Sequence, residues 1–440
     1  MPSRLALAFG ILVLSFVAVA DAVASATLRT HTFNAAADGE ATAIIHATCA
    51  RCAWDAAGRE ASVLTLSLDG RYSQHVVLLR GDRDADYHVA LGAVPAGPHR
   101  LTIAVDPALS APGVRDVSVS RVDVTVAPRE SAEHLALSFA PVLYARANTV
   151  GRFTDVPILM WYEVNPTPRG RQFRYSVIFT NEDGGTATDR LMATWGRTTD
   201  IEYVYGVELD ASGGVVSEEI QAAGHKYPAF QGRHEARHPL LWVDTDNNMV
   251  ADRGTTAIRY APAPERFDLT NVSREAVMDA HAWSYRVAAQ EMVREGKIRE
   301  DAAAGSGLIP DPRRFVYVEA CTELRNAAVA FSIRAADRDG HDAWYDSDRG
   351  MPEFRIVRTG CFRGAVPLPA GAGPASAIRF RAFTKRDEHS QGPSAVTVTR
   401  VNRVFTLDRE YLPSTSRFEW TGSIVLEIDG DWHDLVFGGR

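Results

Sequence analysis

The sequence contains few cysteines and none of the motifs that mark nucleotide-dependent enzymes. Only four of its 440 residues are cysteine, and it has no Walker motif, dinucleotide fingerprint or Gly-x-Ser-x-Gly elbow. ATP-dependent and nicotinamide-dependent chemistry can therefore be set aside. Segments dense in Lys or Arg are also missing, and the formal net charge is -8, so we expect no nucleic-acid partner.

Long hydrophobic runs are limited to one segment near the start of the sequence. Residues 5–17 are mostly apolar, follow Arg4, and precede small residues that include Ala24, Ser25 and Ala26. This arrangement predicts a secretory signal peptide over residues 1–26, because the apolar run is too short to span a membrane. We expect a mature chain that is secreted or periplasmic and has no membrane span.

The composition is that of a globular protein, with 46% hydrophobic and 23% charged residues. Over residues 27–140, short apolar runs alternate with turns: residues 62–68 precede Asp69 and Gly70, for example. This spacing predicts a β-sandwich domain. Residues 94–105 also resemble the corner and strand of immunoglobulin-like domains, a resemblance that implies this fold and no particular function.

Residues 141–440 predict a larger, β-rich and sandwich-like main domain with one long helix. Strand alternation is clearest in an apolar face formed by Ile201, Tyr203, Tyr205, Val207 and Leu209. Apolar residues at helical spacing predict the helix at about 273–298. We therefore expect a mainly β protein in which the N-terminal immunoglobulin-like β-sandwich is an accessory domain.

An even number of cysteines in an exported chain favours disulfide bonds. We predict the bridges Cys49–Cys52 and Cys321–Cys361, because each pair lies within one expected folding unit. Cys49 and Cys52 also have the spacing of a redox motif, but they follow a strand-like segment instead of opening a helix. A structural bridge is therefore favoured over a redox site, and a four-cysteine zinc site ranks below both.

The segment from His234 to His238 resembles the H-E-x-x-H pattern of zinc proteases, in which a helix places both histidines on one face. Gly232 and Pro239 flank the segment and a strand-like run follows, so the required helix is missing and we do not expect zinc here. Two readings stay open for this segment. It is either a polar loop between strands or part of a substrate cleft without a metal, lined by His225, His234 or His238.

Directly downstream, residues 244–252 carry oxygen-bearing side chains at odd-numbered positions. These residues are Asp244, Asp246, Asn248 and Asp252. Their spacing resembles the first nine positions of an EF-hand loop, although Met249 replaces the usual glycine and Thr255 replaces the bidentate glutamate. The segment predicts a calcium site, and the alternative is an ordinary solvated turn.

Carboxylates suited to glycoside hydrolysis are numerous, and they include Glu163, Glu182, Asp200, Glu202 and Glu208. Such an enzyme needs two of them at a set separation, which the sequence does not reveal. The candidates for catalysis are Asp200, Glu202, His225, His234, Glu235 and His238. Aromatic residues that could stack on a sugar are Trp161, Tyr162 and Trp242, although most aromatic side chains fill cores.

These observations support three classes of function. The first is a secreted or periplasmic protein that binds an extracellular ligand, most plausibly a glycan, with loops of residues 160–260. The second is an extracellular hydrolase or lyase that acts on a polysaccharide, with the stretch from His234 to Asp252 at the rim of its active site. The third is a structural envelope protein. Convergence of the candidate residues in one cleft would favour the second class.

Overall fold

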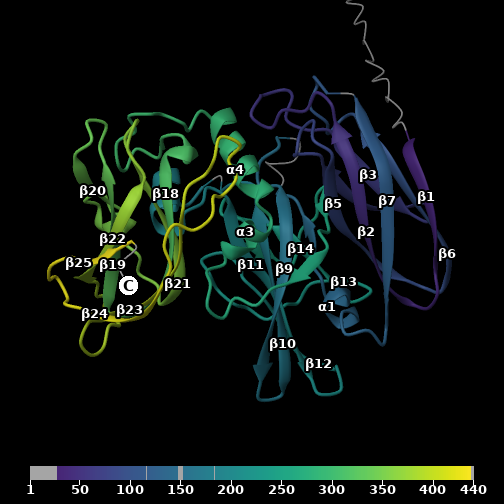
Figure 1. Cartoon of the computed structure of the whole chain (residues 1–440). Helices are drawn as coiled ribbons and strands as arrows, with labels where there is room; N and C mark the ends of the chain where they lie inside the picture. The colour runs from purple at the N-terminus through teal and green to yellow at the C-terminus, as the bar shows by residue number, and fades with distance from the viewer. Residues whose placement is uncertain (1–26, 115, 147–151, 183, 438–440) are drawn as a thin grey trace, which may run out of the picture.

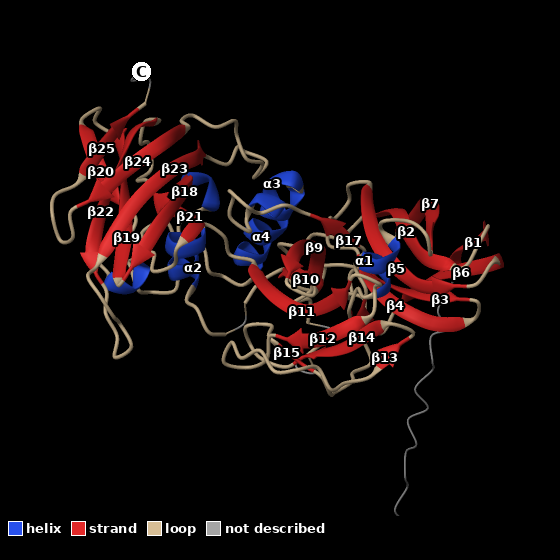
Figure 2. Cartoon of the chain, turned by 90° about the horizontal axis from the view of Figure 1, so that it is seen from below, coloured by secondary structure: helices blue, strands red, loops and turns tan. Residues whose placement is uncertain are grey.

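The prediction of a mainly β protein is confirmed. A computed structural model describes residues 27–114, 116–146, 152–182 and 184–437, so the signal peptide predicted for residues 1–26 lies outside the described residues. Three sets of sheets lie in a row along the molecule, in chain order, with helices α3 and α4 between the second set and the third (Figures 1 and 2). No helix among the described residues is both long enough and apolar enough to cross a membrane.

The first set of sheets is the predicted N-terminal β-sandwich. One sheet has the order β1 (Thr27–Ala35), β6 (Gly97–Asp106), β3 (Val63–Leu68) and β4 (Arg71–Val77), and the other has β5 (Ala85–Val94), β2 (Gly39–Cys49) and β7 (Val117–Pro128). Alternate apolar residues of both sheets form one shared core. The turn between β5 and β6 carries the chain from one sheet to the other, so the segment 94–105 forms a corner and a strand, as its sequence predicts.

The second set also consists of two sheets, and it contains the loops in which we expected a ligand. One sheet has the order β12 (Val215–Ile220), β11 (Asp200–Asp210), β10 (Gly170–Phe179), β9 (Pro157–Thr167) and β17 (Pro264–Arg266). The other has β13 (His234–Glu235), β14 (His238–Val243), β8 (Val142–Tyr144) and β16 (Arg259–Tyr260), with β15 (Val250–Ala251) beside β14. Two short helices also belong to this part of the chain: α1 (His134–Ser138), and α2 (Thr188–Trp195), which packs against the third set of sheets.

Strand β11 contains a bulge that changes which side chains face the core. Tyr205 lies opposite Tyr175, but Tyr203 lies opposite the next residue, Ser176, so Val204 is an extra residue on β11. One extra residue reverses the side-chain alternation on either side of it.

The reversal has a direct effect on the carboxylates of this strand. Ile201 packs into a different core from Val207, although the sequence alternation puts the two on one face. Asp200 and Glu202 consequently lie on the side that faces the second sheet. Asn248, in a loop of that sheet, bonds Asp200, and Gln221, which directly follows β12, bonds Glu202.

The third set is a second sandwich, so the predicted main domain contains two separate pairs of sheets. Its first sheet has the order β21 (Gly360–Pro367), β18 (Phe315–Arg325), β23 (Ala395–Phe405) and β24 (Trp420–Leu426). Its second sheet has β20 (Asp342–Asp346), β19 (Ala327–Ala336), β22 (Ala375–Thr384) and β25 (His433–Val436). Single 3-10 turns occur at Pro312–Arg314 and Pro352–Phe354.

The single helix predicted at about 273–298 is two shorter helices. They are α3 (Ala276–Ala280) and α4 (Trp283–Arg294), and the chain leaves the helical conformation at His281, where φ is -119° and ψ is 61°. His281 pairs with Glu265 of β17 at 3.0 Å, a contact outside the helix that the apolar spacing does not reveal. Ser273, just before α3, donates a hydrogen bond to the buried carboxylate of Glu319 at 2.9 Å.

Both predicted disulfides are confirmed. Cys49 bonds Cys52 in the N-terminal sandwich, and Cys321 on β18 bonds Cys361 on β21, where the two Cα atoms are 3.9 Å apart. The second bridge closes a loop of 40 residues across neighbouring strands.

Replacing Cys321 and Cys361 by serine should lower the free energy of unfolding by about 3 to 4 kcal/mol, because the unfolded chain regains the entropy of the open loop. The matched control replaces Cys49 and Cys52, which close a loop of sequence separation 3 and should cost about 2 kcal/mol. Urea unfolding of both variants provides the comparison. Equal losses in the two variants would show that loop length does not set the effect.

Candidate functional site

A polar cleft lies where the loops of the second set of sheets meet helix α2. Its cavity volume is ≈ 280 Å³. The lining residues come from five separate segments, and those used below are Glu182, Trp195, Asp200, Glu202, Gln221, His225, Tyr227, Asn247 and Arg274. Three predicted catalytic candidates, Asp200, Glu202 and His225, therefore meet in one cleft.

Glu202 is connected by hydrogen bonds to other polar side chains that line the cleft. Its side chain is 8% exposed and accepts a hydrogen bond from the Gln221 amide nitrogen. The Gln221 amide oxygen in turn accepts a hydrogen bond from the Tyr227 hydroxyl at 3.2 Å, and the Gln221 nitrogen lies 3.4 Å from His225 Nδ1. Tyr227 is 54% exposed, so this chain of polar groups ends at an aromatic ring on the lip of the cleft.

Asp200 lies deeper, at 2% exposure, and is held from two directions. Asn248 donates an amide hydrogen bond to it at 3.0 Å, and the guanidinium of buried Arg197 lies 3.9 Å from its other oxygen. Arg197 also pairs with Glu275 at 3.1 Å, so its charge is shared between two carboxylates. Asp200 thus adds negative charge below the cleft floor without being accessible to a large ligand.

Glu182 comes from the loop that follows β10. Its carboxylate accepts a hydrogen bond from the Thr186 backbone N–H at 2.8 Å, which fixes the loop that leads into α2. The same helix brings Trp195 to the cleft wall. In the sequence, Glu182 is one of several candidate carboxylates. Only the geometry of its loop shows that it lines the cleft.

Asp200 acts electrostatically on both glutamates of the cleft. Burial, together with the neighbouring Asp200, raises the pKa of Glu202 to about 8 and that of Glu182 to about 7. Burial also raises the pKa of Asp200. Perturbed carboxyl groups of this kind concentrate at functional sites, because such a group can donate or accept a proton near neutral pH.

The raised pKa values predict a specific dependence of stability on pH. The folded state holds these two protons more tightly than the unfolded chain, so their stabilising contribution is complete below about pH 4.5 and is lost as the pH rises through 7 to 8. The two groups together should lose on the order of 5 kcal/mol between pH 5 and pH 8. In urea unfolding, a variant with Glu182→Gln and Glu202→Gln should not show this loss of unfolding free energy between pH 5 and pH 8. An unchanged difference between the two pH values would contradict this origin.

The remaining candidates from the H-E-x-x-H segment lie outside the cleft. The segment is a hairpin of β13 and β14, not a helix, and Ala236 in its turn has a φ of 56°. His234 pairs with Glu218 at 2.8 Å, whereas His238 is buried between Glu40 and the Ala140 carbonyl. Glu235 pairs with Arg259 at 2.6 Å, so these three residues have separate structural partners and are not brought to one site.

The stretch from His234 to Asp252, which we expect at the rim of an active site, reaches this cleft only in part. Within the stretch from His234 to Asp252, Asn247 lines the cleft, but the two histidines and Glu235 do not. His225, which precedes that stretch, does line it.

The predicted calcium residues have different partners in the structure. Asp246 forms an ion pair with Arg146, and Asn248 directs its amide toward Asp200. Asp252 accepts a hydrogen bond from the Gln231 backbone N–H at 3.1 Å, and Asp244 is exposed. Among the described residues, no group of three or more His, Cys, Asp and Glu side chains is arranged to hold a metal ion.

Calcium binding at this loop stays a prediction, and it can be tested by measuring the melting temperature. If calcium binds there, it should raise the melting temperature in a concentration-dependent way, and Asp244→Ala should abolish the gain. A melting temperature that is the same in calcium and in chelator would contradict the prediction.

The aromatic residues expected to stack on a sugar lie elsewhere. Trp161 is completely buried in one core and Tyr162 is buried in another, which corrects their expected role in binding. Trp242 is half-buried on β14 and does not line the cleft. The aromatic residues that do line it are Trp195 and Tyr227. The sequence signal that could have indicated Tyr227 is a tyrosine within a loop rich in Gly, Ala and Pro.

Comparisons with known proteins give few matches. No protein-family model and no curated protein matches the chain. The solved structure of NLPPya in complex with glucosamine is 13% identical, covering 42% of this chain and 85% of that chain, with a TM-score of 0.25. A family 35 carbohydrate binding module from an environmental isolate is 15% identical, covering 22% of this chain and 69% of that chain, with a TM-score of 0.15. Scores this low support no argument about function.

Proposed function

We propose that this protein is secreted or periplasmic and binds a glycan in the cleft formed by Glu202, Gln221, His225 and Tyr227. Sugar hydroxyls both donate and accept hydrogen bonds, and the cleft offers a carboxyl, an amide and an imidazole within one connected network. Tyr227 adds an exposed ring against which the apolar face of a sugar can pack. The observation that carries the proposal is this network ending at an exposed ring.

The proposed location has independent support. The predicted signal peptide indicates export, and the two disulfide bonds are typical of an oxidising compartment. A glycan is also the kind of ligand that an exported β-sandwich protein meets outside the cytoplasm. The proposed partner is therefore an extracellular glycan, or a smaller ligand with the same hydroxyl chemistry.

Cleavage of the glycan in the same cleft is the second candidate function, and one observation favours it. Glu182 and Glu202 both have a pKa near 7 to 8, so one can be protonated while the other is ionised. A protonated carboxyl and a neighbouring carboxylate are the pair that glycoside hydrolysis requires. On this alternative the protonated group would donate its proton to the leaving oxygen.

A glycan array combined with a polysaccharide-degradation screen separates the two candidates. The mature protein should bind a subset of glycans, and Tyr227→Ala should remove that binding because it deletes the exposed ring. The matched control is Tyr72→Ala, which removes another exposed tyrosine from β4, outside the cleft. Binding that survives Tyr227→Ala, or no binding to any glycan, would contradict the proposal. Release of shorter sugars would establish cleavage.

A further inference from the structure

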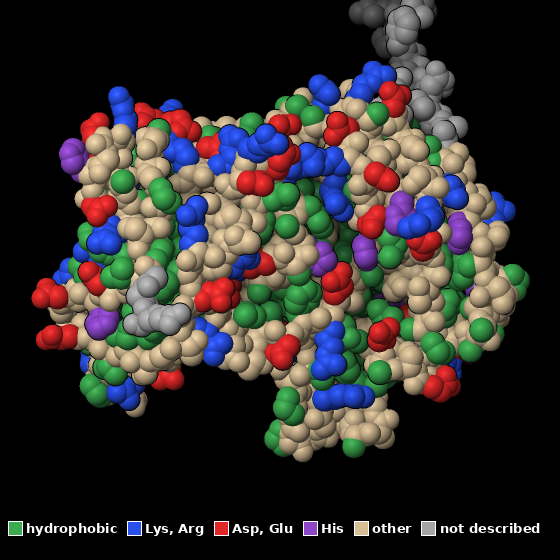
Figure 3. All heavy atoms as spheres, viewed as in Figure 1, with side chains coloured by type: hydrophobic (Ala, Val, Ile, Leu, Met, Phe, Trp, Pro, Cys, Tyr) green, Lys and Arg blue, Asp and Glu red, His purple; other side chains and the backbone are tan. Residues whose placement is uncertain are grey.

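A second, separate cavity lies at the junction between the N-terminal sandwich and the second set of sheets. Figure 3 shows a hollow there, with hydrophobic side chains at its floor and charged and histidine side chains around it. Its volume is ≈ 240 Å³. The walls come from β4 and β5 on one side, and from the start of β9 and the segment between α3 and α4 on the other.

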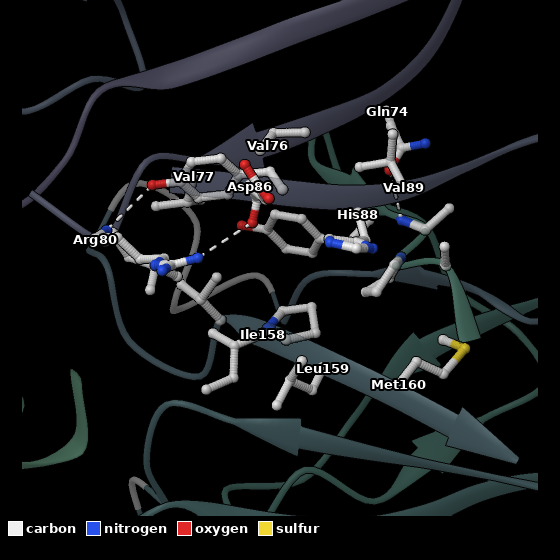
Figure 4. A pocket seen from close by; sticks show the side chains of 18 of the residues that line it. Gln74, Val76, Val77, Arg80, Asp86, His88, Val89, Ile158, Leu159 and Met160 are labelled. Atoms are coloured by element: carbon white, nitrogen blue, oxygen red, sulfur yellow. Dashed lines mark hydrogen bonds between the residues drawn. The ribbon is translucent and has the colours of Figure 1, made fainter. Parts of the chain in front are cut away.

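The interior of this cavity is aliphatic. Val76 and Val77 lie on one side and Ile158 and Leu159 lie opposite them (Figure 4). Ile158 and Leu159 are only half-buried, although both belong to the junction between two packed units. Leaving apolar side chains uncovered in this way costs free energy that a bound apolar group would recover.

The cavity is formed by rigid parts of the fold. The segment 261–263 continues the sheet at β5: the Ala90 N–H donates to the Ala261 carbonyl at 2.8 Å, and the Ala263 N–H donates to the His88 carbonyl at 3.1 Å. The Gln74 amide adds hydrogen bonds to Ala90 and Ala261. These bonds fix the two units beside the cavity, so a ligand would meet a preformed site.

The charged groups at the rim are already partnered within the chain. Glu265 pairs with His281 at 3.0 Å, and Asp86 pairs with His46. The Arg80 guanidinium stacks over the Trp283 ring, 4.8 Å from its centroid. The imidazole of His88, in contrast, makes no hydrogen bond within the part of the chain that the structure describes.

From this arrangement we infer that the cavity binds a compact, uncharged amphipathic molecule. Its apolar body would fill the space between Val77 and Leu159, and a single hydroxyl or carbonyl would bond the His88 imidazole. An anionic ligand fits less well, because its carboxylate would meet the carboxylates of Asp86 and Glu265 at the rim. This site is distinct from the polar cleft, and the inference does not depend on the proposed function.

The probes for this site are p-cresol, cyclohexanol and 4-methylbenzoate. Titrations of the full mature chain, followed by calorimetry and by the fluorescence of its tryptophans, should show saturable binding of p-cresol with a Kd of about 1 mM or tighter. The anionic 4-methylbenzoate should bind at least about fivefold more weakly. Leu159→Trp fills the cavity and should abolish binding, and His88→Ala should weaken it about five- to tenfold.

Two controls keep this test decisive. Val425→Trp places the same side chain on the exposed edge strand β24 and should leave p-cresol binding unchanged. Ile158→Trp serves as a second blocking variant if Leu159→Trp unfolds. The inference is overturned if neither p-cresol nor cyclohexanol binds saturably, if the two blocking variants bind as the wild type does, or if 4-methylbenzoate binds more tightly than p-cresol.

Discussion

Replacing Glu202 by alanine should weaken binding of the glycan about 10- to 100-fold, because the substitution removes the central hydrogen-bonding group of the cleft and leaves the Gln221 amide without its partner. Glu202→Gln should have a much smaller effect on affinity below pH 7. With a pKa of about 8, the carboxyl is mostly protonated there, and the amide has a similar shape and is also uncharged. Calorimetric titration at pH 6 with a glycan selected on the array gives both affinities.

The same pair of variants separates binding from catalysis. If Glu202 donates a proton in glycan cleavage, Glu202→Gln should lower kcat by 10² to 10⁴ while the affinity stays close to that of the wild type. Glu208→Ala is the matched control, since Glu208 lies on the same strand but pairs with Arg169, away from the cleft. If Glu202→Ala and Glu208→Ala weakened binding equally, the cleft would not be the binding site.

The sequence predicts the sheets of this protein better than it predicts the cleft. Short alternating runs and turn residues are local signals, and they predict the N-terminal sandwich and strand β11. Both disulfides follow from the even number of cysteines and from their places in the expected folding units. The bulge at Val204 has no such signal, because an alternating strand has the same sequence with or without it. The alternation alone therefore places Glu202 on the polar face of the strand, opposite Ile201 and Tyr203, whereas in the structure it lies inside the cleft.

Contacts between residues far apart in the sequence explain the other differences between the sequence-based predictions and the structure. Glu182, Glu202 and His225 line one cleft because the loop after β10, strand β11 and the loop after β12 come together there, and no spacing along the chain encodes that meeting. The break at His281 likewise depends on Glu265, a residue of a distant strand. The H-E-x-x-H segment was correctly predicted not to be helical, because Gly232 and Pro239 are local signals.

Arg363 is the side chain whose loss should destabilise the fold most. It is completely buried on β21, and its guanidinium reaches three different elements: Glu319 on β18, Asp279 on α3 and the Tyr285 hydroxyl on α4. The arginine therefore connects the C-terminal sandwich to both helices. Arg403 adds a second cation 2.9 Å from Asp279, so the network is nearly neutral as a whole.

Arg363→Met should lower the free energy of unfolding by about 3 to 5 kcal/mol, because it fits the space but removes the arginine partner of the buried Glu319 and the partly buried Asp279. Arg363→Lys should recover only part of the loss, since an ammonium cannot bond Glu319 and Asp279 with the same fork. Hydrogen exchange of peptides from β18, β21 and α4 is the appropriate measurement, since it reports this region separately from the N-terminal sandwich.

The buried charge, not the loss of a large side chain, should account for most of this effect. Adding Glu319→Gln and Asp279→Asn to Arg363→Met should restore part of the protection, because the stranded negative charges are then removed. The control for an exposed pair is Arg51→Met, whose partner Asp116 lies 2.7 Å away on the surface, and it should change stability by less than about 1 kcal/mol. A triple variant less protected than Arg363→Met alone would show that lost packing dominates.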